Sequence, residues 1–202
     1  MAFDYFTTLF PILTAVIGIF FLITGLKGLL TKRPFLISNA WMLVMMFVLF
    51  VPMGLSSITI LDVSPITWVT PILYAALLVM MCYQLKGYVA FAITDTSFRE
   101  ALVAALQRLE LPYEESLSVI RLTSVEADLQ VSIQSWMGTG VIKTKHRAHR
   151  SVLKEVVDAM NEYFRTSSVS TNMVTCVFWV VMGAALPIAG FSMFFLLKPF
   201  NL

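Results

Sequence analysis

Charged residues are scarce in this sequence. Of its 202 residues, 13% are Asp, Glu, Lys or Arg and 58% are hydrophobic, whereas an average globular protein has about 25% charged and about 45–50% apolar residues. The deficit of charge is concentrated in long uncharged blocks. An ordinary water-soluble domain therefore does not account for the whole chain.

Cysteine and histidine are also rare, with two residues of each. Cys82 and Cys176 are expected to be free thiols, buried as small hydrophobic side chains and kept reduced. His146 and His149 lie three residues apart, but no cysteine or carboxylate lies near them in the sequence to complete a tetrahedral set of metal ligands. We therefore predict no metal site and no cofactor.

Motifs for phosphate and nucleic-acid chemistry are missing. The stretch MGTGVIKT at 137–144 lacks the spacing of a P-loop. Segment 84–172 has ten basic and ten acidic residues, so it lacks the positive charge that dominates nucleic-acid binding. It also shows no Ser–His–Asp, Cys–His or paired-carboxylate constellation. Nucleic acid is thus not an expected partner, and a role other than catalysis is favoured.

Long apolar blocks are the most prominent feature that is present. They run from about 9 to 26, 35 to 61, 66 to 83 and 173 to 197. About 20 apolar residues in a helix cross the hydrocarbon core of a bilayer, and the alternation typical of a membrane barrel is absent. We therefore predict a bundle of four transmembrane helices. No block has an ionisable residue in its interior, which argues against ion-coupled transport.

Basic residues predict the orientation of the chain. Asp4 and no Lys or Arg precede the first block, so this block is expected to be a retained helix and not a cleaved signal. Ten of the fourteen Lys and Arg lie in 84–172, and the loop around Asp62 has none. The positive-inside rule then predicts both termini outside and 84–172 in the cytoplasm, in a bacterial inner membrane or an equivalent one.

Three regions follow from these patterns. Residues 1–83 are predicted to form the first three transmembrane helices, at about 9–26, 35–61 and 66–83. Residues 84–172 are predicted to form a cytoplasmic α+β domain inserted between the third and fourth helices. Residues 173–202 are predicted to form the fourth helix and a short outside tail.

The cytoplasmic segment shows the periods of both strands and helices. Residues 88–94 favour a strand, and the next residues favour a helix that starts at a capping box of Ser97 and Glu100. The apolar positions of this helix are Phe98, Leu102, Leu106 and Leu109. Three strands are then expected, the middle one with Leu129, Val131 and Ile133 on one face. A last helix buries Leu153, Val156, Val157, Met160 and Phe164. The order β-α-β-β-β-α predicts an antiparallel sandwich with both helices on one side.

A basic run follows the predicted MGTG turn. Its candidate binding residues are Lys143, Lys145, Arg147, His149 and Arg150. They cover the last strand and the start of the last helix, where cations oppose the helix dipole and an anion would relieve the conflict. The site would suit a lipid headgroup, a phosphate or an acidic partner. The alternative is a solvated strand edge, which Lys and Arg protect from aggregation.

Trp136 and Met137, at the tip of the predicted hairpin, form a second candidate site. They would anchor the turn in the membrane interface, where Trp is favoured, or fill a contact with the membrane helices or a partner. We predict a non-enzymatic integral membrane protein, an accessory or assembly subunit of a membrane complex. Its α+β domain would dock a protein partner or a second copy of the chain, with membrane lipid around the helices. The alternative is a transporter or lipid-handling protein with an anionic-headgroup site at the start of the last cytoplasmic helix.

Overall fold

The computed structural model describes residues 2–48, 51, 68–84, 86–116, 119–125, 127–145 and 147–197. Two compact units divide the chain. The first, here the helical unit, comprises Met1–Ile23, Ala40–Leu85 and Trp179–Leu202. The second, here the sheet unit, comprises Thr24–Asn39 and Lys86–Phe178.

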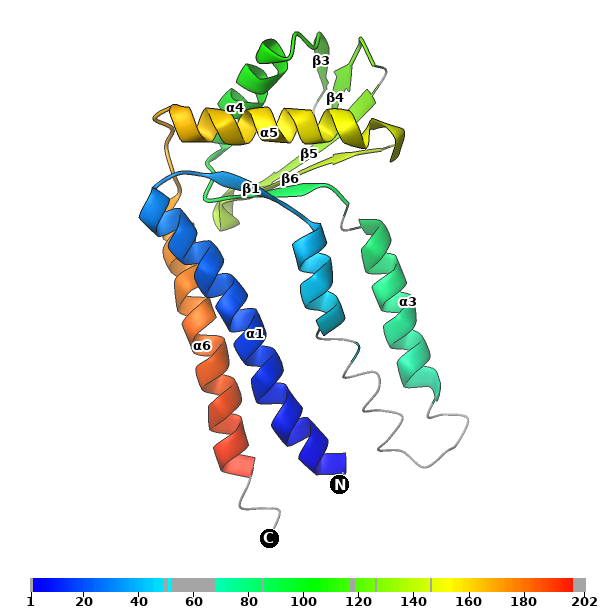
Figure 1. The fold of residues 1–202 in the computed structure, drawn as a ribbon, viewed down its shortest axis with the longest axis vertical. Helices are drawn as coiled ribbons and strands as arrows, with labels where there is room; N and C mark the ends of the chain where they lie inside the picture. The colour runs from blue at the N-terminus through cyan, green and yellow to red at the C-terminus, as the bar shows by residue number, and fades with distance from the viewer. Residues whose placement is uncertain are drawn as a thin grey trace. The chain divides into compact units, whose positions relative to one another are not determined.

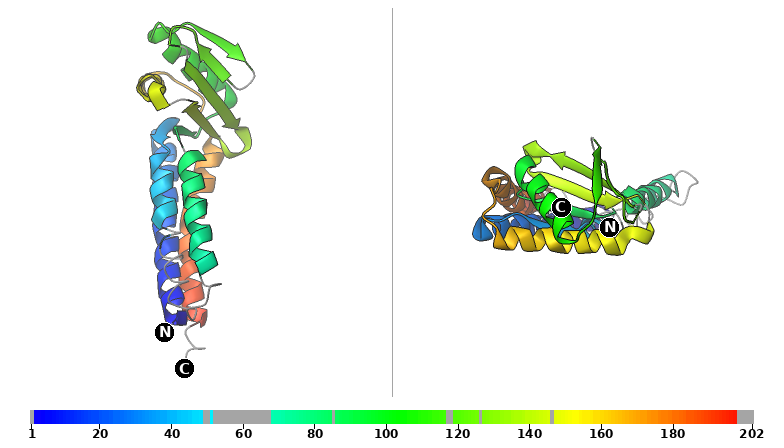
Figure 2. Two further views of the ribbon diagram at one scale, coloured as in Figure 1. Left: turned by 90° about the vertical axis from the view of Figure 1, so that its right-hand side faces the viewer. Right: turned by 90° about the horizontal axis from the view of Figure 1, so that it is seen from above.

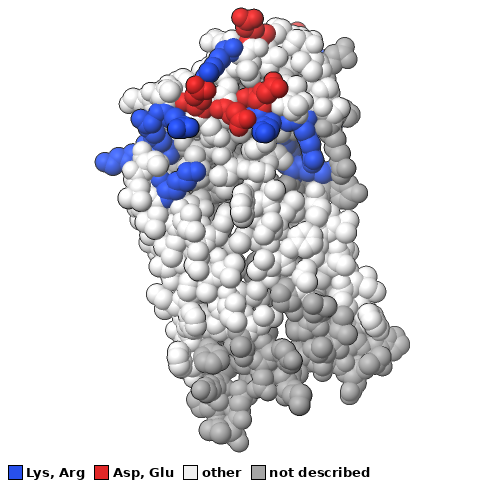
Figure 3. Space-filling view, viewed as in Figure 1, with Lys and Arg blue, Asp and Glu red and all other residues white. Residues whose placement is uncertain are grey.

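The helical unit is built from segments of α1 (Ala2–Thr31) and α6 (Met173–Leu197), helical residues 40–48 and α3 (Val69–Gln84) (Figure 1). Asp4 is the one charged residue among the described residues of this unit. The charged side chains visible in Figure 3 belong to the sheet unit. Helices with so little charge on any face are typical of a lipid or protein interior.

Glycines bring α1 and α6 together within the helical unit. A Cβ atom on Gly18 would lie 2.5 Å from Pro187 Cγ and 2.6 Å from the Gly183 carbonyl oxygen. A Cβ on Gly183 would lie 2.8 Å from the Gly18 carbonyl oxygen. Only residues without a side chain allow the two backbones to approach this closely. Pro187 has no N–H to bond the Gly183 carbonyl, and Gly18 packs against that carbonyl.

The prediction of four transmembrane helices is wrong for the described residues. Two helical stretches among them are long and apolar enough to cross a membrane, Leu9–Thr31 and Met173–Met193. The second predicted span begins as a strand, and its helix starts only at residue 40. In the third predicted span, the apolar stretch of helix α3 is Pro71–Cys82. It is shorter than the roughly 20 residues that a membrane-spanning helix needs. Residues 49, 50 and 52–67, which hold the rest of these two predicted helices and the Asp62 loop, lie outside the described residues.

The prediction of a membrane helix at this position was wrong because hydropathy measures how apolar a segment is and does not show which other segment it packs against. The misread strand, β1 (Phe35–Ser38), pairs antiparallel with β2 (Tyr88–Phe91), and Phe35 stacks on Phe91 with ring centroids 5.7 Å apart. A buried strand has the same composition as part of a membrane helix. Here β1 follows directly on Pro34, whose ring disfavours helical geometry at the residue before it.

The sheet has six strands, and every pairing between neighbours is antiparallel. The other four strands are β3 (Tyr113–Ser116), β4 (Val119–Leu122), β5 (Ala127–Gln134) and β6 (Thr139–Thr144). Their order is β1-β2-β6-β5-β4-β3. The predicted order β-α-β-β-β-α is corrected accordingly, because it omitted both edge strands, β1 and β3.

Helices α4 (Asp95–Arg108) and α5 (Arg150–Thr166) lie on the same side of the strands (Figure 2). Their apolar faces form one core with the inward residues of the sheet, as the helical spacing predicted. The start of α4 differs from the prediction. Thr94 is the N-cap and forms the capping box with Ser97, since the Thr94 side chain accepts from the Ser97 N–H and the Ser97 side chain accepts from the Thr94 N–H.

The opposite side of the sheet is apolar near β1 and β2. The register places Phe35, Val89 and Phe91 there, and all three are buried. The ends of the two long helices adjoin this area. Lys27 of α1 lies over the Phe35 ring, with Nζ 4.2 Å from its centroid. Just before α6, the Asn172 N–H donates to the Ala92 carbonyl at 2.9 Å. The last part of α1 and the first turns of α6 thus belong to the sheet unit.

Candidate functional site

A groove lies between α4 and strands β3 to β5. It has a cavity volume of about 370 Å³. Its apolar lining comes from Phe98, Leu102, Val103, Leu106, Val119, Ile120, Val131 and Ile133. Val131 and Ile133 are on the inner side of β5 and yet only half-buried. α5 lies against β1 and β6, whereas the helix residues that line this groove come from α4.

Polar pairs bridge the rim of the groove. Arg99 on α4 forms an ion pair with Glu115 on β3 at 2.8 Å, and both side chains are exposed to solvent, by 68% and 45%. Ser135 donates from its hydroxyl to the Asp95 carboxylate at 2.6 Å, which ties the end of β5 to the first turn of α4. Exposed pairs of this kind contribute little to stability. Their effect is to give an apolar groove a rim with charges of both signs.

A second, polar cleft lies beside α5. It is an open depression of about 630 Å³ lined by Arg33, Asp158, Asn161, Glu162, Arg165 and Thr166. At its base, the Leu36 N–H donates to Asn161 Oδ1 at 2.8 Å, and Asn161 Nδ2 donates to the Leu36 carbonyl at 3.3 Å. The Arg33 guanidinium donates to the Arg165 carbonyl. These bonds fasten the edge strand β1 to α5, so the cleft has a clear structural role.

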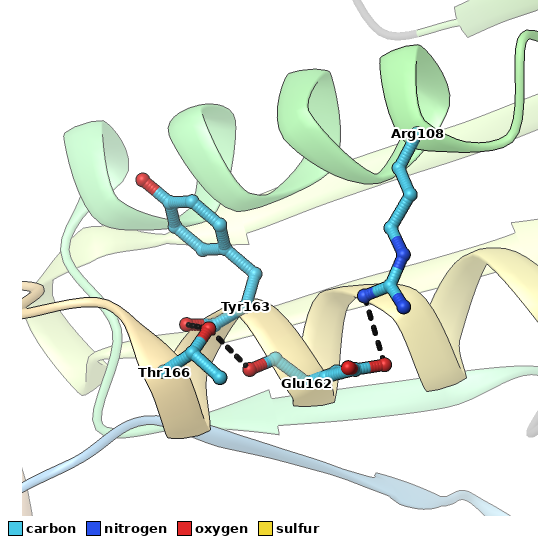
Figure 4. A network of polar contacts seen from close by, with 4 residues as sticks. All are labelled: Arg108, Glu162, Tyr163 and Thr166. Atoms are coloured by element: carbon cyan, nitrogen blue, oxygen red, sulfur yellow. Dashed lines mark hydrogen bonds and ion pairs between the residues drawn. The ribbon is translucent and has the colours of Figure 1, made fainter.

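Surface contacts continue from this cleft to α4. Figure 4 shows Arg108, in the last turn of α4, directed toward Glu162 on α5, with a separation of 2.8 Å. The Thr166 hydroxyl donates to the Glu162 carbonyl at 3.0 Å, one turn earlier in the same helix. More than half of each charged side chain is exposed. The pair therefore aligns the two helices more than it stabilises them.

The predicted basic run does not lie on one face. Lys143 is on β6 in register with Gln130, which places it on the side of the sheet opposite to α5. Lys145 follows β6 and is exposed. His149 is the N-cap of α5 and Arg150 its first residue. The side chain of Arg147 and the whole of His146 lie outside the described residues. An anion- or partner-binding role for these residues remains a prediction.

The charge of Arg150 influences the pKa of Tyr88, which lies on the inner side of the sheet. Burial raises the pKa of the Tyr88 hydroxyl above its ordinary value, the negative charge of Asp158 raises it further, and the positive charge of Arg150 lowers it. Tyr88 faces inward on β2, beside Ile142 of β6. Arg150 and Lys143 are thus separated by the sheet, although they are only seven residues apart.

The turn between β5 and β6 forms where the sequence predicted it. Ser135–Met137 make one turn of 3-10 helix, and Gly138 ends it in the left-handed conformation, with φ +54°. Trp136 is 83% exposed and Met137 is half-buried. The structure therefore places both residues at a surface, next to each other in one turn.

Sequence reasoning missed the groove and Asn161. The groove depends on which strands each helix covers, and no local pattern carries that information. Asn161 left a weak signal, because it stands four residues after the buried Val157, where the helical spacing calls for an apolar side chain. A polar residue at such a position often has a specific buried hydrogen-bond partner.

Comparison with known proteins adds no assignment. No protein family, no curated protein and no solved structure matches the chain. The geometry of the described residues therefore carries the functional argument.

Proposed function

We propose that the protein is an accessory or assembly subunit of a membrane complex, held in the bilayer by α1 and α6. Its sheet unit docks a partner protein on the cytoplasmic side. The observation that supports this proposal best is the groove between α4 and β3–β5, an apolar surface that the chain's own helices leave open.

The membrane location is supported by length and charge. Leu9–Thr31 and Met173–Met193 are 23 and 21 residues long, and a helix of that length covers about 30 Å. Thirteen of the fourteen Lys and Arg belong to the sheet unit. Those that lie close to the end of α1, Lys27, Lys32 and Arg33, favour the cytoplasmic side for this unit.

The groove suggests the chemistry of the partner. Interfaces derive most of their affinity from a few apolar or aromatic side chains that fill a pocket, with polar groups at the rim. A volume of about 370 Å³ fits two or three such side chains. We propose a partner segment with this apolar core, flanked by an acidic residue for Arg99 and a basic residue for Asp95.

The test compares two substitutions on α4. Val103→Arg places a charge in the groove, whereas Gln107→Arg places the same charge four residues away on the exposed side of the same helix. The tagged full-length protein is purified from native membranes in mild detergent, and bound proteins and lipids are identified by mass spectrometry. We expect one stoichiometric protein partner with wild type and with Gln107→Arg. With Val103→Arg its recovery should fall about tenfold, equivalent to about 1.4 kcal/mol.

Thermal unfolding of both variants controls for folding. Equal loss of the partner with both substitutions would show that the groove is not the docking surface. A defined lipid bound stoichiometrically in place of a protein, and lost with Val103→Arg, would contradict partner docking and favour lipid handling.

A further inference from the structure

We infer that the turn between β5 and β6 is a membrane anchor, with Trp136 inserted among the lipid headgroups and the first acyl carbons. This inference rests on the proposed membrane location and adds a second contact with the bilayer, outside the two long helices. Three observations support it: the exposure of Trp136, the position of the turn beside α6, and the cations at the same level on α1.

The exposure of Trp136 is exceptional within its surroundings. Among the described residues from 86 to 172, it is the only large hydrophobic side chain that is exposed. The other exposed large hydrophobic residues of the described chain lie on α1, α3, α6, residues 41–51 or Trp68. Trp combines a large apolar ring system with an N–H that needs a hydrogen-bond partner. Trp is therefore, together with Tyr, enriched at the boundary between lipid and water.

The turn is fixed beside the start of α6. A Cβ atom on Gly138 would lie 2.9 Å from Thr175 Cβ and 2.9 Å from Asn172 Nδ2. The Gly138 carbonyl accepts from the Ile93 N–H at 3.1 Å, which holds the turn against the sheet as well. Trp136 is two residues from this contact. Its level along α6 is thus that of the first helical turn.

That first turn is also where the surface of α6 becomes apolar. Val174 is 80% exposed, and Val177 and Phe178 are about half-exposed. Leu9–Thr31 and Met173–Met193 are the two stretches proposed to cross the membrane, so Val174 lies at the boundary of one of them. Val174 and Trp136 are both exposed, and both belong to segments that meet at the Gly138–Thr175 contact. Exposed apolar side chains at this level suit acyl chains.

The end of α1 supplies cations at the same level. A Cβ on Gly28 would lie 3.6 Å from Cys176 Cβ, so the last turn of α1 and the first turn of α6 touch. Lys27 precedes Gly28 and Lys32 follows it, shortly after the end of α1, and both are exposed. Lys and Arg at the ends of a membrane helix extend toward the headgroups. Aromatic and basic residues at one level are typical of a membrane interface.

The test uses the four tryptophans of the chain as depth probes. In one variant Trp136 is the only tryptophan, with Trp41→Phe, Trp68→Phe and Trp179→Phe. In the other, Trp179 is the only one, with Trp136→Phe in place of Trp179→Phe. Trp179 is six residues into α6, which is about 9 Å along the helix from its start. Both full-length proteins are reconstituted in phosphatidylcholine vesicles that carry a nitroxide either near the glycerol backbone or near the end of the acyl chain.

We expect the shallow nitroxide to remove about half of the Trp136 emission and the deep nitroxide to remove less, as for other interfacial tryptophans. Trp179 should respond to the deep label more than Trp136 does. Iodide in the water should quench Trp136 only weakly.

Each alternative result would contradict a specific part of the proposal. If iodide quenches Trp136 and neither lipid label does, while Trp179 responds to lipid, the anchor is wrong and the membrane location stands. Stronger quenching of Trp136 by the deep label than by the shallow one also overturns the interfacial position. If neither tryptophan responds to lipid, the proposed membrane location fails as well. Should a triple variant not fold, the difference between wild type and Trp136→Phe gives the quenching of Trp136, and the single variant Trp136→Phe gives the lipid response of the three remaining tryptophans, Trp179 among them.

Discussion

Asn161 shows how one side chain joins two distant parts of this chain. It lies on α5, whereas its partner Leu36 lies 125 residues earlier, on the edge strand β1. The carboxamide both accepts from the Leu36 N–H and donates to the Leu36 carbonyl, so it replaces the neighbouring strand that an edge residue lacks. An apolar residue of the same size would fill the space but leave two backbone groups unpaired.

We predict that Asn161→Leu destabilises the sheet unit by about 1–3 kcal/mol, the usual effect of leaving a buried polar group unsatisfied. Chemical unfolding in mild detergent, followed by circular dichroism, measures it. Glu162→Gln is the matched control on the same helix, since it removes only the exposed ion pair with Arg108 and should change the free energy of unfolding by less than about 1 kcal/mol. Equal unfolding of Asn161→Leu and wild type would show that solvent replaces the Asn161 bonds.

At the scale of helices and strands, some features depend on residues within one element, and others depend on contacts with a distant segment. The apolar faces of α4 and α5 were predicted correctly, and so was the alternation on β5, because each depends on residues within one element. The capping box of α4 was misplaced by three residues, because Ser is on average a better N-cap residue than Thr, whereas α4 begins after Thr94. The packing of α1 on α6 depends on the close approach of Gly18 and Gly183, which are far apart in the sequence.

We predict that Gly183→Leu separates α1 from α6. The new side chain would meet Leu22 and the Gly18 carbonyl, and such overpacking destabilises by about 1–3 kcal/mol. Ala184→Leu is the control, because Ala184 is exposed on the same helix and has room for the larger side chain. The midpoint of unfolding by added dodecyl sulfate distinguishes them, with a lower midpoint expected for Gly183→Leu only. Identical midpoints would contradict direct backbone contact.

At the scale of the molecule, the sheet is assembled from two segments that are far apart in the sequence. β1 precedes helical residues 40–48, and β2 follows α3. Their pairing closes a loop of more than 45 residues, and the loop contains a large part of the helical unit. β2 is also paired with β6, whereas β1 is an edge strand paired with β2. This edge of the sheet is therefore supplied by a segment that precedes helical residues 40–48.

This arrangement predicts a specific pattern of hydrogen exchange in the full-length protein in detergent. Both β1 and β3 are edge strands, but Asn161 pairs with the backbone of β1. We expect the amides of Phe35–Ser38 to exchange on the same timescale as those of Tyr88–Phe91, and more slowly than those of Tyr113–Ser116. Stable hydrogen-bonded units open together, whereas exposed edges open locally. Exchange of β1 as fast as that of β3 would show that β1 opens independently of the sheet.

The sequence by itself determined where charge is absent, which segments are long and apolar, and which faces of α4 and α5 are buried, because these properties depend on residues a few positions apart. Only the tertiary structure decided that Phe35–Ser38 is a strand, that β3 and β1 close the edges, that Lys143 and Arg150 lie on opposite sides of the sheet, and that a groove remains beside α4. Each of these depends on contacts between residues tens of positions apart. The free energy of such contacts comes from pairing and burial against a distant partner, which hydropathy and periodicity do not contain.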